Sequence, residues 1–340
     1  MDTKPAAGIP SPALFLDTSS AYRRSAALRA AIELDVFTAL ADGPLDAAAL
    51  AARCGAAPRG MRILCDALAS LGVLQKVEGR YLLTMEAAVF LNRNSPACMA
   101  DGFLFLTSPH IQNAFRDLTA AVRRGGTSQT ASDVLAPEHD FWLDFARAMA
   151  PMMAFPADSI AQLLGAERGE RWSVLDIAAG HGIFGIAIGR QNPNAVITAV
   201  DWPGVLEIAT QNAEAAGLAG RYRTVPGSAF DVELGSGYDV VLLTNFLHHF
   251  DSATNEALLR RVHAALAPRG RVATLEFMPD EDRLSPEFAA MFALNMLVHT
   301  PAGDAYTFAE IESMFRSAGF GPSEWHPLPP GPQGLVITRR

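Results

Sequence analysis

Residues 174–182 (Val-Leu-Asp-Ile-Ala-Ala-Gly-His-Gly) have the composition of a ligand-binding turn between a strand and a helix. An apolar strand runs into a loop of small residues, a helix is expected over 183–190, and a second strand over 195–200 is followed by Asp201. Such a loop lets the backbone approach a ligand closely, and an acid roughly 20 residues later can hold the ribose hydroxyls of a nucleoside. The spacing therefore predicts a nucleoside-binding site.

The identity of the nucleoside depends on Asp176. Gly180, Gly182 and Gly185 fit the G-x-G-x-x-G pattern of dinucleotide sites, which makes NAD one candidate. Asp176 argues against NAD, because a carboxylate inside the loop turn would repel a pyrophosphate. It would attract the ammonium and sulfonium groups of S-adenosylmethionine. The residues favour S-adenosylmethionine over NAD, and a tight turn without a ligand is the third interpretation.

The composition argues against some classes of binding partner and indicates the cellular compartment. The 340 residues carry a formal net charge of −9, which disfavours a nucleic-acid partner because phosphate binding needs a clustered basic surface. Three cysteines (Cys54, Cys65 and Cys98) have no metal-like spacing and predict reduced thiols in a cytoplasmic protein. No stretch resembles a signal peptide, and no apolar run approaches the length of a membrane span.

The first 100 residues are expected to form a mostly helical domain of winged-helix type. Helical spacing covers 14–40, two short helices follow at 47–54 and 59–71, and a hairpin is predicted from the strands 73–76 and 80–83. The second short helix carries only Arg59 and Arg62 as basic residues. A packing or dimer-forming role is therefore favoured over DNA binding.

Residues 101–165 are predicted to be bridging helices that line a substrate pocket. The segment is rich in large apolar side chains, including Phe145, Met149 and Met152. Such residues usually belong to a core, but methionine and aromatic groups also suit the wall of a pocket for a flat organic ligand. An exposed loop is expected over 125–132.

Residues 166–340 are predicted to form an α/β domain with a doubly wound, Rossmann-like sheet, because strands and helices alternate along the chain. The expected strands are 173–177, 195–200, 221–225, 238–243 and 271–277, with a last pair near 323–326 and 334–338. Ligands of such sheets bind outside the carboxyl ends of the strands. The candidate cofactor contacts are therefore Asp176, Gly180, Gly182, Asp201, Trp202, Ser228, Ala229, Phe230, Thr244 and Asn245.

Several motifs in one order along nearly the whole chain resemble a known family. They are Val174–Gly182, Val200-Asp-Trp-Pro203, Asn245-Phe-Leu-His-His-Phe250, Leu266-Ala-Pro-Arg-Gly270, Thr274-Leu-Glu276 and the stretch from Met296 to Thr307. The chain resembles S-adenosylmethionine-dependent O-methyltransferases of the plant caffeate and acetylserotonin type, with their bacterial relatives in natural-product pathways.

The resemblance implies roles for individual residues. His248 would be the catalytic base and Glu276 the acid that orients it. Asp201 would hold the ribose of the cofactor, and Gly180 with its neighbours would contact the methionine part. It also implies a homodimer in which N-terminal helices close the pocket of the partner chain.

The sequence departs from the family pattern at five places, one of which is the family's His-Asp pair, which is His248-His249 here. The usual Gly-Gly-Gly loop is Ala178-Ala179-Gly180, which is acceptable if the first two positions need no positive φ. The acid that commonly contacts adenine falls on Ser228, and a common lysine falls on Thr244. The second catalytic acid falls on Ala305, and whether the adjacent Asp304 replaces it is open, as is the role of His181.

The expected reaction is O-methylation of a hydroxyl on a small aromatic or polyketide-like molecule. A phenol has a pKa near 10, so at neutral pH a histidine held in one tautomer by a carboxylate helps to remove its proton. The candidate pocket residues are Phe145, Met149, Met152, His249, Asn295 and His299. No metal is expected. The alternatives are C- or N-methylation, with a metal at His248, His249 and His299, or a relative that binds the cofactor without transferring methyl.

Overall fold

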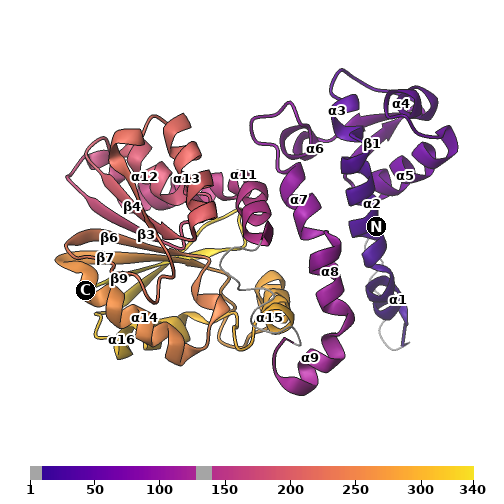
Figure 1. Cartoon of the computed structure of the whole chain (residues 1–340). Coiled ribbons are helices and arrows are strands. Elements are labelled where there is room, and N and C mark those ends of the chain that lie inside the picture. The colour runs from indigo at the N-terminus through magenta and orange to yellow at the C-terminus, as the bar shows by residue number, and fades with distance from the viewer. Residues whose placement is uncertain (1–9, 128–139) are drawn as a thin grey trace. The chain divides into compact units, whose positions relative to one another are not determined.

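The computed structural model describes residues 10–127 and 140–340, which form two compact units (Figure 1). The first unit is Met1–Ile111 and the second is Gln112–Arg340. The boundary lies within the helix α8 (Pro109–Arg116). Each unit is described by itself below.

The first unit is mostly helical. Its helices are α1 (Ala13–Ser20), α2 (Tyr22–Glu33), α3 (Val36–Ala39), α4 (Ala47–Arg53), α5 (Pro58–Ser70), α6 (Met85–Phe90) and α7 (Ala100–Leu106). The single helix expected over 14–40 was wrong, because Asp35 adopts a left-handed conformation (φ 55°) and turns the chain between α2 and α3. The expected helix starting at Ala47 is confirmed, and the Asp46 carboxylate caps it by accepting the Ala49 N–H at 2.8 Å.

A short hairpin completes the winged-helix pattern. Strands β1 (Leu74–Val77) and β2 (Arg80–Leu83) pair antiparallel, and Glu78 and Gly79 in the turn both have positive φ, as a tight two-residue hairpin turn requires. Apolar faces of α2, α4 and α5 pack around Phe37, Met61 and Leu68 to form the core of this unit.

The second unit contains a seven-stranded sheet in the order β5-β4-β3-β6-β7-β9-β8. Its strands are β3 (Ser173–Ile177), β4 (Val196–Asp201), β5 (Tyr222–Pro226), β6 (Tyr238–Thr244), β7 (Leu266–Glu276), β8 (Ser323–Pro327) and β9 (Gly334–Arg339). The five strands β5, β4, β3, β6 and β7 are parallel, whereas β9 runs antiparallel between β7 and β8. The predicted doubly wound sheet is confirmed.

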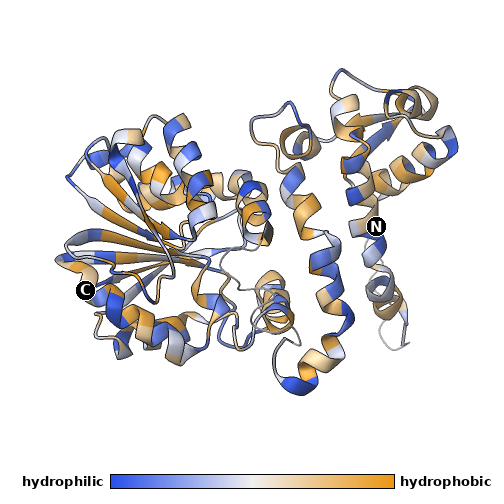
Figure 2. Cartoon of the chain, viewed as in Figure 1, coloured by the Kyte–Doolittle hydropathy of each residue, from blue (hydrophilic) through white to orange (hydrophobic). Residues whose placement is uncertain are grey.

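Helices cover the sheet on both faces (Figure 1). They are α11 (Asp140–Leu163), α12 (Ile183–Gln191), α13 (Pro203–Ala215), α14 (Ser252–Ala265) and α16 (Phe308–Ser317). The unit also contains α9 (Leu118–Arg124) and α15 (Glu287–His299), which contact each other, and the short 3-10 turns η1 (Ala166–Arg168), η2 (Ala219–Arg221) and η3 (Leu247–His249). The inner strands β3, β6 and β9 are hydrophobic along most of their length (Figure 2), because both of their faces are buried, whereas the edge strands β5 and β8 are largely exposed.

Alternate residues of one strand serve the two cores. Leu175 and Ile177 of β3 join the core beneath α14 and α16, whereas Val174 joins the core beneath α11 and α12. The sheet is therefore packed against helices on both faces. The loops that follow the parallel strands all lie at one edge, where the strands have their carboxyl ends. No helix in the described part of the chain is long and apolar enough to cross a membrane.

Candidate active site

The loop that follows β3 is built from backbone conformations that favour glycine. Gly180 and Gly182 have φ values of 56° and 74°, and Ala178 also lies in the left-handed region at 54°. The condition that the first two loop positions need no positive φ is therefore not met at Ala178, where a side chain in this conformation costs on the order of 1 kcal/mol. A Cβ on Gly182 would lie 2.6 Å from the Tyr222 hydroxyl, so only glycine fits there.

Asp176 lies beneath the loop and not inside the turn, which corrects the sequence expectation. It is the fourth residue of β3 and is fully buried. Its Oδ2 accepts the Gly185 N–H at 3.1 Å, while its Oδ1 has no hydrogen-bond partner within the described residues. Burial raises the pKa of this carboxyl from its ordinary value of 3.8 to about 7, although the Gly185 hydrogen bond opposes the shift.

Asp201 ends β4, the neighbour of β3, and its carboxylate is fixed against the loop. Oδ2 accepts the Gly180 N–H at 2.8 Å, and Oδ1 accepts the Trp202 N–H at 2.7 Å. Burial raises the pKa of Asp201, and the two backbone donors oppose that shift. The structure thus brings the predicted loop and the predicted acid into direct contact.

His181 has a structural role that the sequence left open. Its ring Nδ1 accepts the Ile183 N–H at 3.2 Å, which satisfies one of the free donors in the first turn of α12. The side chain is buried, and desolvation lowers its pKa to about 4, so the ring is neutral at pH 7. His181 therefore stabilises the start of α12.

The remaining candidate cofactor contacts lie beyond β5 and β6. Ser228 Oγ accepts the Phe230 N–H at 3.1 Å, and Ala229 is buried between them. Thr244 is the last residue of β6, and Asn245, with φ 54°, turns the chain away from the sheet. The Gln333 side chain donates to Asn245 Oδ1, which fixes this turn.

His248 and Glu276 form a close, buried polar pair at the strand ends. The Nδ1 of His248, in η3, lies 2.5 Å from Glu276 Oε2 at the end of β7, and both side chains are buried. The other oxygen, Oε1, accepts the N–H groups of Phe246 at 3.0 Å and Leu247 at 2.9 Å, with His248 N–H at 3.4 Å. A carboxylate only accepts, so Nδ1 carries the hydrogen and Nε2 is left with a lone pair.

Buried Asn255 of α14 holds the same turn from its other side. Its amide donates to the Leu247 carbonyl at 2.9 Å and to the Phe250 carbonyl at 3.3 Å. Gly303 packs against the turn so closely that a Cβ would lie 2.2 Å from the His248 carbonyl oxygen. Neither residue was identified from the sequence, because both act through contacts with backbone atoms, and Gly303 is also distant from the turn in sequence.

His249 and His299 lie near His248 in an apolar setting. The rings of His248 and His249 are 4.3 Å apart, and Phe292 of α15 meets His248 edge-on at 4.9 Å. Burial, with the neighbouring His248 and His299, lowers the pKa of His249 well below 6.5.

The alternative of a metal held by the three histidines finds no support in their geometry. Nδ1 of His248 is engaged by Glu276, and Nδ1 of His299 lies 2.9 Å from the Asn295 carbonyl oxygen, so a metal could meet these two rings only at Nε2. Across residues 10–127 and 140–340, no group of three His, Cys, Asp or Glu side chains is arranged to hold a metal ion.

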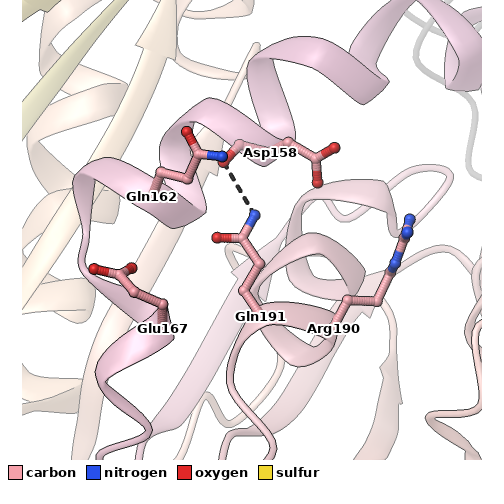
Figure 3. Close-up of a pocket in the computed structure, with 5 residues that line it drawn as sticks. All are labelled: Asp158, Gln162, Glu167, Arg190 and Gln191. Atoms are coloured by element: carbon pink, nitrogen blue, oxygen red, sulfur yellow. Dashed lines mark hydrogen bonds between the residues drawn. The ribbon is translucent and has the colours of Figure 1, made fainter.

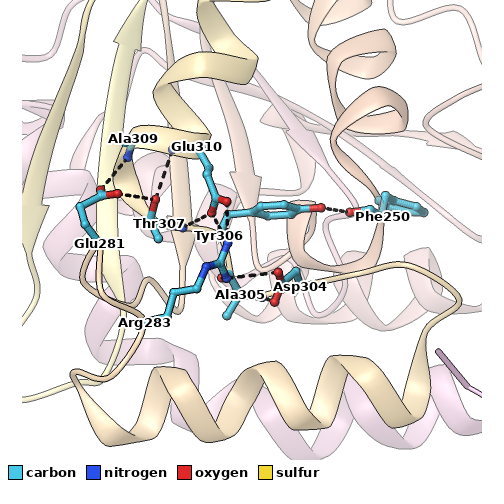
Figure 4. Close-up of polar contacts among 9 residues, drawn as sticks. All are labelled: Phe250, Glu281, Arg283, Asp304, Ala305, Tyr306, Thr307, Ala309 and Glu310. Atoms are coloured by element: carbon cyan, nitrogen blue, oxygen red, sulfur yellow. Dashed lines mark hydrogen bonds and ion pairs between the residues drawn. The ribbon is translucent and has the colours of Figure 1, made fainter. Parts of the chain in front are cut away.

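Asp304 is engaged elsewhere. Figure 4 shows its carboxylate directed at the Arg283 guanidinium, 3.2 Å away, and its Oδ1 also accepts the Ala305 N–H at 2.8 Å. Arg283 further binds both carboxylate oxygens of Glu310. The charge of Asp304 is therefore matched by Arg283, and this network fastens the segment before α16 rather than supporting His248.

The predicted pocket residues divide into three groups. Met149 and Met152 of α11 pack against the core beneath that helix. Phe145, by contrast, belongs to an aromatic cluster with Phe141 and Trp142, and Trp142 meets the His249 ring at 6.1 Å. Asn295 and His299 of α15 contact each other through the Asn295 carbonyl.

An open polar hollow on the second unit lies away from this site. It is lined by Asp158, Gln162, Glu167, Arg190 and Gln191 (Figure 3). Arg190 and Gln191 end α12, whereas the glycine loop begins it, and a nine-residue helix is about 13 Å long. The hollow therefore lies at the opposite end of the sheet from His248.

Comparison with known proteins identifies the family. Residues 115–321 match the O-methyltransferase domain family, and residues 16–93 match the O-methyltransferase dimerisation domain. The chain is 33% identical to 3-hydroxy-5-methyl-1-naphthoate 3-O-methyltransferase of Streptomyces sahachiroi over 91% of this chain and 89% of that protein.

Solved structures agree with this result. A crystal structure from Nostoc punctiforme, described as an O-methyltransferase, superposes with a TM-score of 0.92 at 52% identity, covering 98% of this chain and all of that one. Human N-acetylserotonin methyltransferase in complex with S-adenosylmethionine has the same fold, with a TM-score of 0.86 at 24% identity, over 98% of this chain and 99% of that one. This chain belongs to the O-methyltransferase family, with a catalytic and a dimerisation domain.

Proposed function

We propose that this enzyme transfers the methyl group of S-adenosylmethionine to a hydroxyl of a small aromatic or polyketide-like molecule, with His248 as the general base. The observation that carries the proposal is the 2.5 Å contact between His248 Nδ1 and Glu276 Oε2. It places the hydrogen on Nδ1 and leaves Nε2 able to accept a proton from the acceptor hydroxyl.

S-adenosylmethionine is the cofactor of this O-methyltransferase. When bound, it supplies a methyl group on a positively charged sulfur, which a nucleophile displaces without further activation. The loop residues fit such a ligand. Gly180 has positive φ, and a Cβ there would meet nothing closer than the Ala178 carbonyl oxygen at 3.9 Å, so backbone approach at this point is open. The unpartnered Asp176 Oδ1 offers a hydrogen-bonding oxygen beneath the loop.

The other cofactor contacts follow from the edge at which they lie. Asp201 would hold the ribose hydroxyls, because its carboxylate is fixed beside Gly180 and each oxygen retains a lone pair. Trp202, Ser228, Ala229 and Phe230 would surround the base end of the nucleoside, and Thr244 with Asn245 would flank it from β6.

His248 and Glu276 act on the acceptor side. Glu276 holds the imidazole in one tautomer, and apolar neighbours such as Phe292 exclude water from the ring. The acceptor hydroxyl would lie against Nε2, aligned with the methyl group. The aromatic class of the acceptor is supported by the Phe141, Trp142 and Phe145 cluster, and by the relative from S. sahachiroi, whose name records a hydroxynaphthoate.

The dimerisation domain supports a homodimer. Leu14, Phe15 and Leu16 of α1 are between 64% and 74% exposed in the isolated chain, which fits a helix that a second copy covers. Sedimentation of the purified protein would measure the assembly, and a monomer at micromolar concentration would contradict this part of the proposal.

The test of the base is His248→Gln, which keeps a polar side chain of similar size. We expect the formation of S-adenosylhomocysteine from S-adenosylmethionine and a hydroxyarene to fall at least about 100-fold, with the dissociation constant of the cofactor unchanged. Unchanged turnover would remove His248 from the mechanism. Detection of S-adenosylhomocysteine with the native protein also separates a methyltransferase from a relative that only binds the cofactor.

A further inference from the structure

Trp142 of α11 carries a buried hydrogen-bond donor without an acceptor. Its Nε1 is inaccessible to solvent and finds no partner within the described residues. Buried indole N–H groups normally meet an acceptor, because an unpaired donor loses its hydrogen bonds to water without replacement. This donor is therefore expected to meet an oxygen or nitrogen that a ligand brings.

Trp142 lies at the strand ends where the reaction is proposed to take place. The side chain packs with Trp202 against Val205 and Ile208, which follow β4, and its ring meets His249, which follows β6. Strand β3 lies between β4 and β6 in the sheet. Trp142 therefore crosses the carboxyl end of β3, where the glycine loop begins, and α11 lies alongside α12 and α13 (Figure 1).

The surroundings of the indole suit an aromatic ring. Phe141 and Phe145 meet Trp142 edge-on at 5.2 Å and 5.9 Å, with interplanar angles of 78° and 81°, and His249 meets it at 83°. The low pKa of His249 keeps that ring uncharged at pH 7. A flat aromatic molecule with one acceptor oxygen matches this combination of ring edges and a single N–H donor.

The acceptor molecule fits this donor better than the cofactor does. The loop amides, Asp176 and Asp201 already provide polar groups where the cofactor is expected. Trp142, by contrast, touches His249, the residue next to the proposed base, and the acceptor hydroxyl must lie against that base.

We propose that the Trp142 indole N–H donates to a carbonyl or carboxylate oxygen on the aromatic ring of the methyl acceptor, so that this enzyme selects hydroxyarenes bearing such an oxygen. The inference rests on the proposed function, because it assigns the second oxygen of the same acceptor. Trp142 is then a specificity-determining residue that contacts substrate without taking part in the proton transfer.

The test compares two probes on protein loaded with S-adenosylhomocysteine. 3-Hydroxy-2-naphthoate carries the hydroxyl and the carboxylate, 2-naphthol carries the hydroxyl alone, and 3-hydroxy-2-naphthamide replaces the carboxylate by a neutral carbonyl. Calorimetry would give the dissociation constant of each probe for the native protein, for Trp142→Phe, and for Trp325→Phe. Trp325 is a matched control, because it lies on β8 at the sheet edge and is 50% exposed.

We expect the native protein to bind the naphthoate or the naphthamide at least about 10-fold more tightly than 2-naphthol, and Trp142→Phe to remove that preference while 2-naphthol binding stays the same. The relative loss for the two oxygen-bearing probes tells a carboxylate from a carbonyl as the preferred group. Trp325→Phe should behave as the native protein does.

Four outcomes would overturn the proposal. They are a native protein that binds no probe, one without preference for the oxygen-bearing probes, an equal loss for all probes in Trp142→Phe, and a loss confined to S-adenosylhomocysteine. The first two need no variant, so a variant that fails to fold leaves the proposal testable. Failure of the proposed function is distinguished separately, because it would show as absent methyl transfer while probe preference and its dependence on Trp142 persist.

Discussion

The substitution Glu276→Gln tests how the carboxylate sets the tautomer of His248. In the native protein, Oε1 accepts backbone N–H groups from residues 246 to 248, and Oε2 lies 2.5 Å from Nδ1. A glutamine must point its oxygen at the three amides, because the reverse orientation would set an NH₂ group against three N–H donors. Its NH₂ group then faces Nδ1, so Nδ1 must accept and Nε2 must carry the hydrogen.

The predicted loss follows from this reversal. A neutral His248 with its hydrogen on Nε2 cannot take the proton of the acceptor, and the loss of a general base costs about 10² to 10⁴ in turnover. Replacing a charged by a neutral hydrogen bond also weakens folding by about 1 kcal/mol per bond, which an unfolding titration would measure. Cofactor affinity should not change.

The assay is formation of S-adenosylhomocysteine with a phenol as acceptor, followed as pH rises from 7 towards 10. The variant should recover relative to the native enzyme as the phenol, with a pKa near 10, ionises without help. Glu256→Gln is the control, because that carboxylate pairs with Arg260 on the surface of α14. A folded Glu276→Gln enzyme with native turnover at pH 7 would refute the tautomer argument.

Three further predictions concern the loop and the groups beneath it. Ala178→Gly should raise the free energy of unfolding by about 1 kcal/mol in a urea titration, because φ 54° suits glycine, and a destabilised variant would contradict this. Gly182→Ala should weaken S-adenosylhomocysteine binding at least about 10-fold, because the new Cβ would lie 2.6 Å from the Tyr222 hydroxyl. Adding Tyr222→Phe to the same chain removes that hydroxyl and should restore part of the affinity. Calorimetry of both variants would measure the loss and the recovery. The Asp176 carboxyl has a pKa of about 7 in the folded protein and 3.8 in the unfolded chain, so the folded state binds its proton more tightly. Its contribution therefore lowers the free energy of unfolding as pH rises from about 4 to 7. Asp176→Asn should flatten this part of the stability profile, and an unchanged slope would refute the raised pKa.

The centre of the sheet could be predicted from the sequence because strands such as β3 and β6 are short apolar runs between turn residues. Both faces of β3 and β6 are buried, so the runs are continuous and their bounds are sharp. The start of β7 was predicted too late, at residue 271. The strand begins at Leu266, before Pro268 and Gly270, which ordinarily interrupt strands. The expected helix over 14–40 failed for a local reason, since helical spacing continues across the turn at Asp35.

The candidate site was only partly readable. Asp201 followed from spacing, but the pairing of His248 with Glu276 came from the family resemblance, since nothing in either segment alone says that the two ends meet. The positive φ of Ala178 and the unpaired N–H of Trp142 were invisible, because each depends on contacts with distant segments. The partner of Asp304 was missed for the same reason, as Arg283 lies on a separate loop.

The absence of an acid at position 305 leaves Glu276 with two functions. One oxygen fixes the turn that carries His248 through backbone amides, and the other fixes the tautomer of the ring. Asn255 and Gly303 hold the same turn from other sides without adding charge. A second carboxylate is therefore not needed to position the base or to choose its tautomer. Because one side chain does both, losing Glu276 should change the position and the tautomer of His248 together. Losing Asn255 should change only the position of the ring.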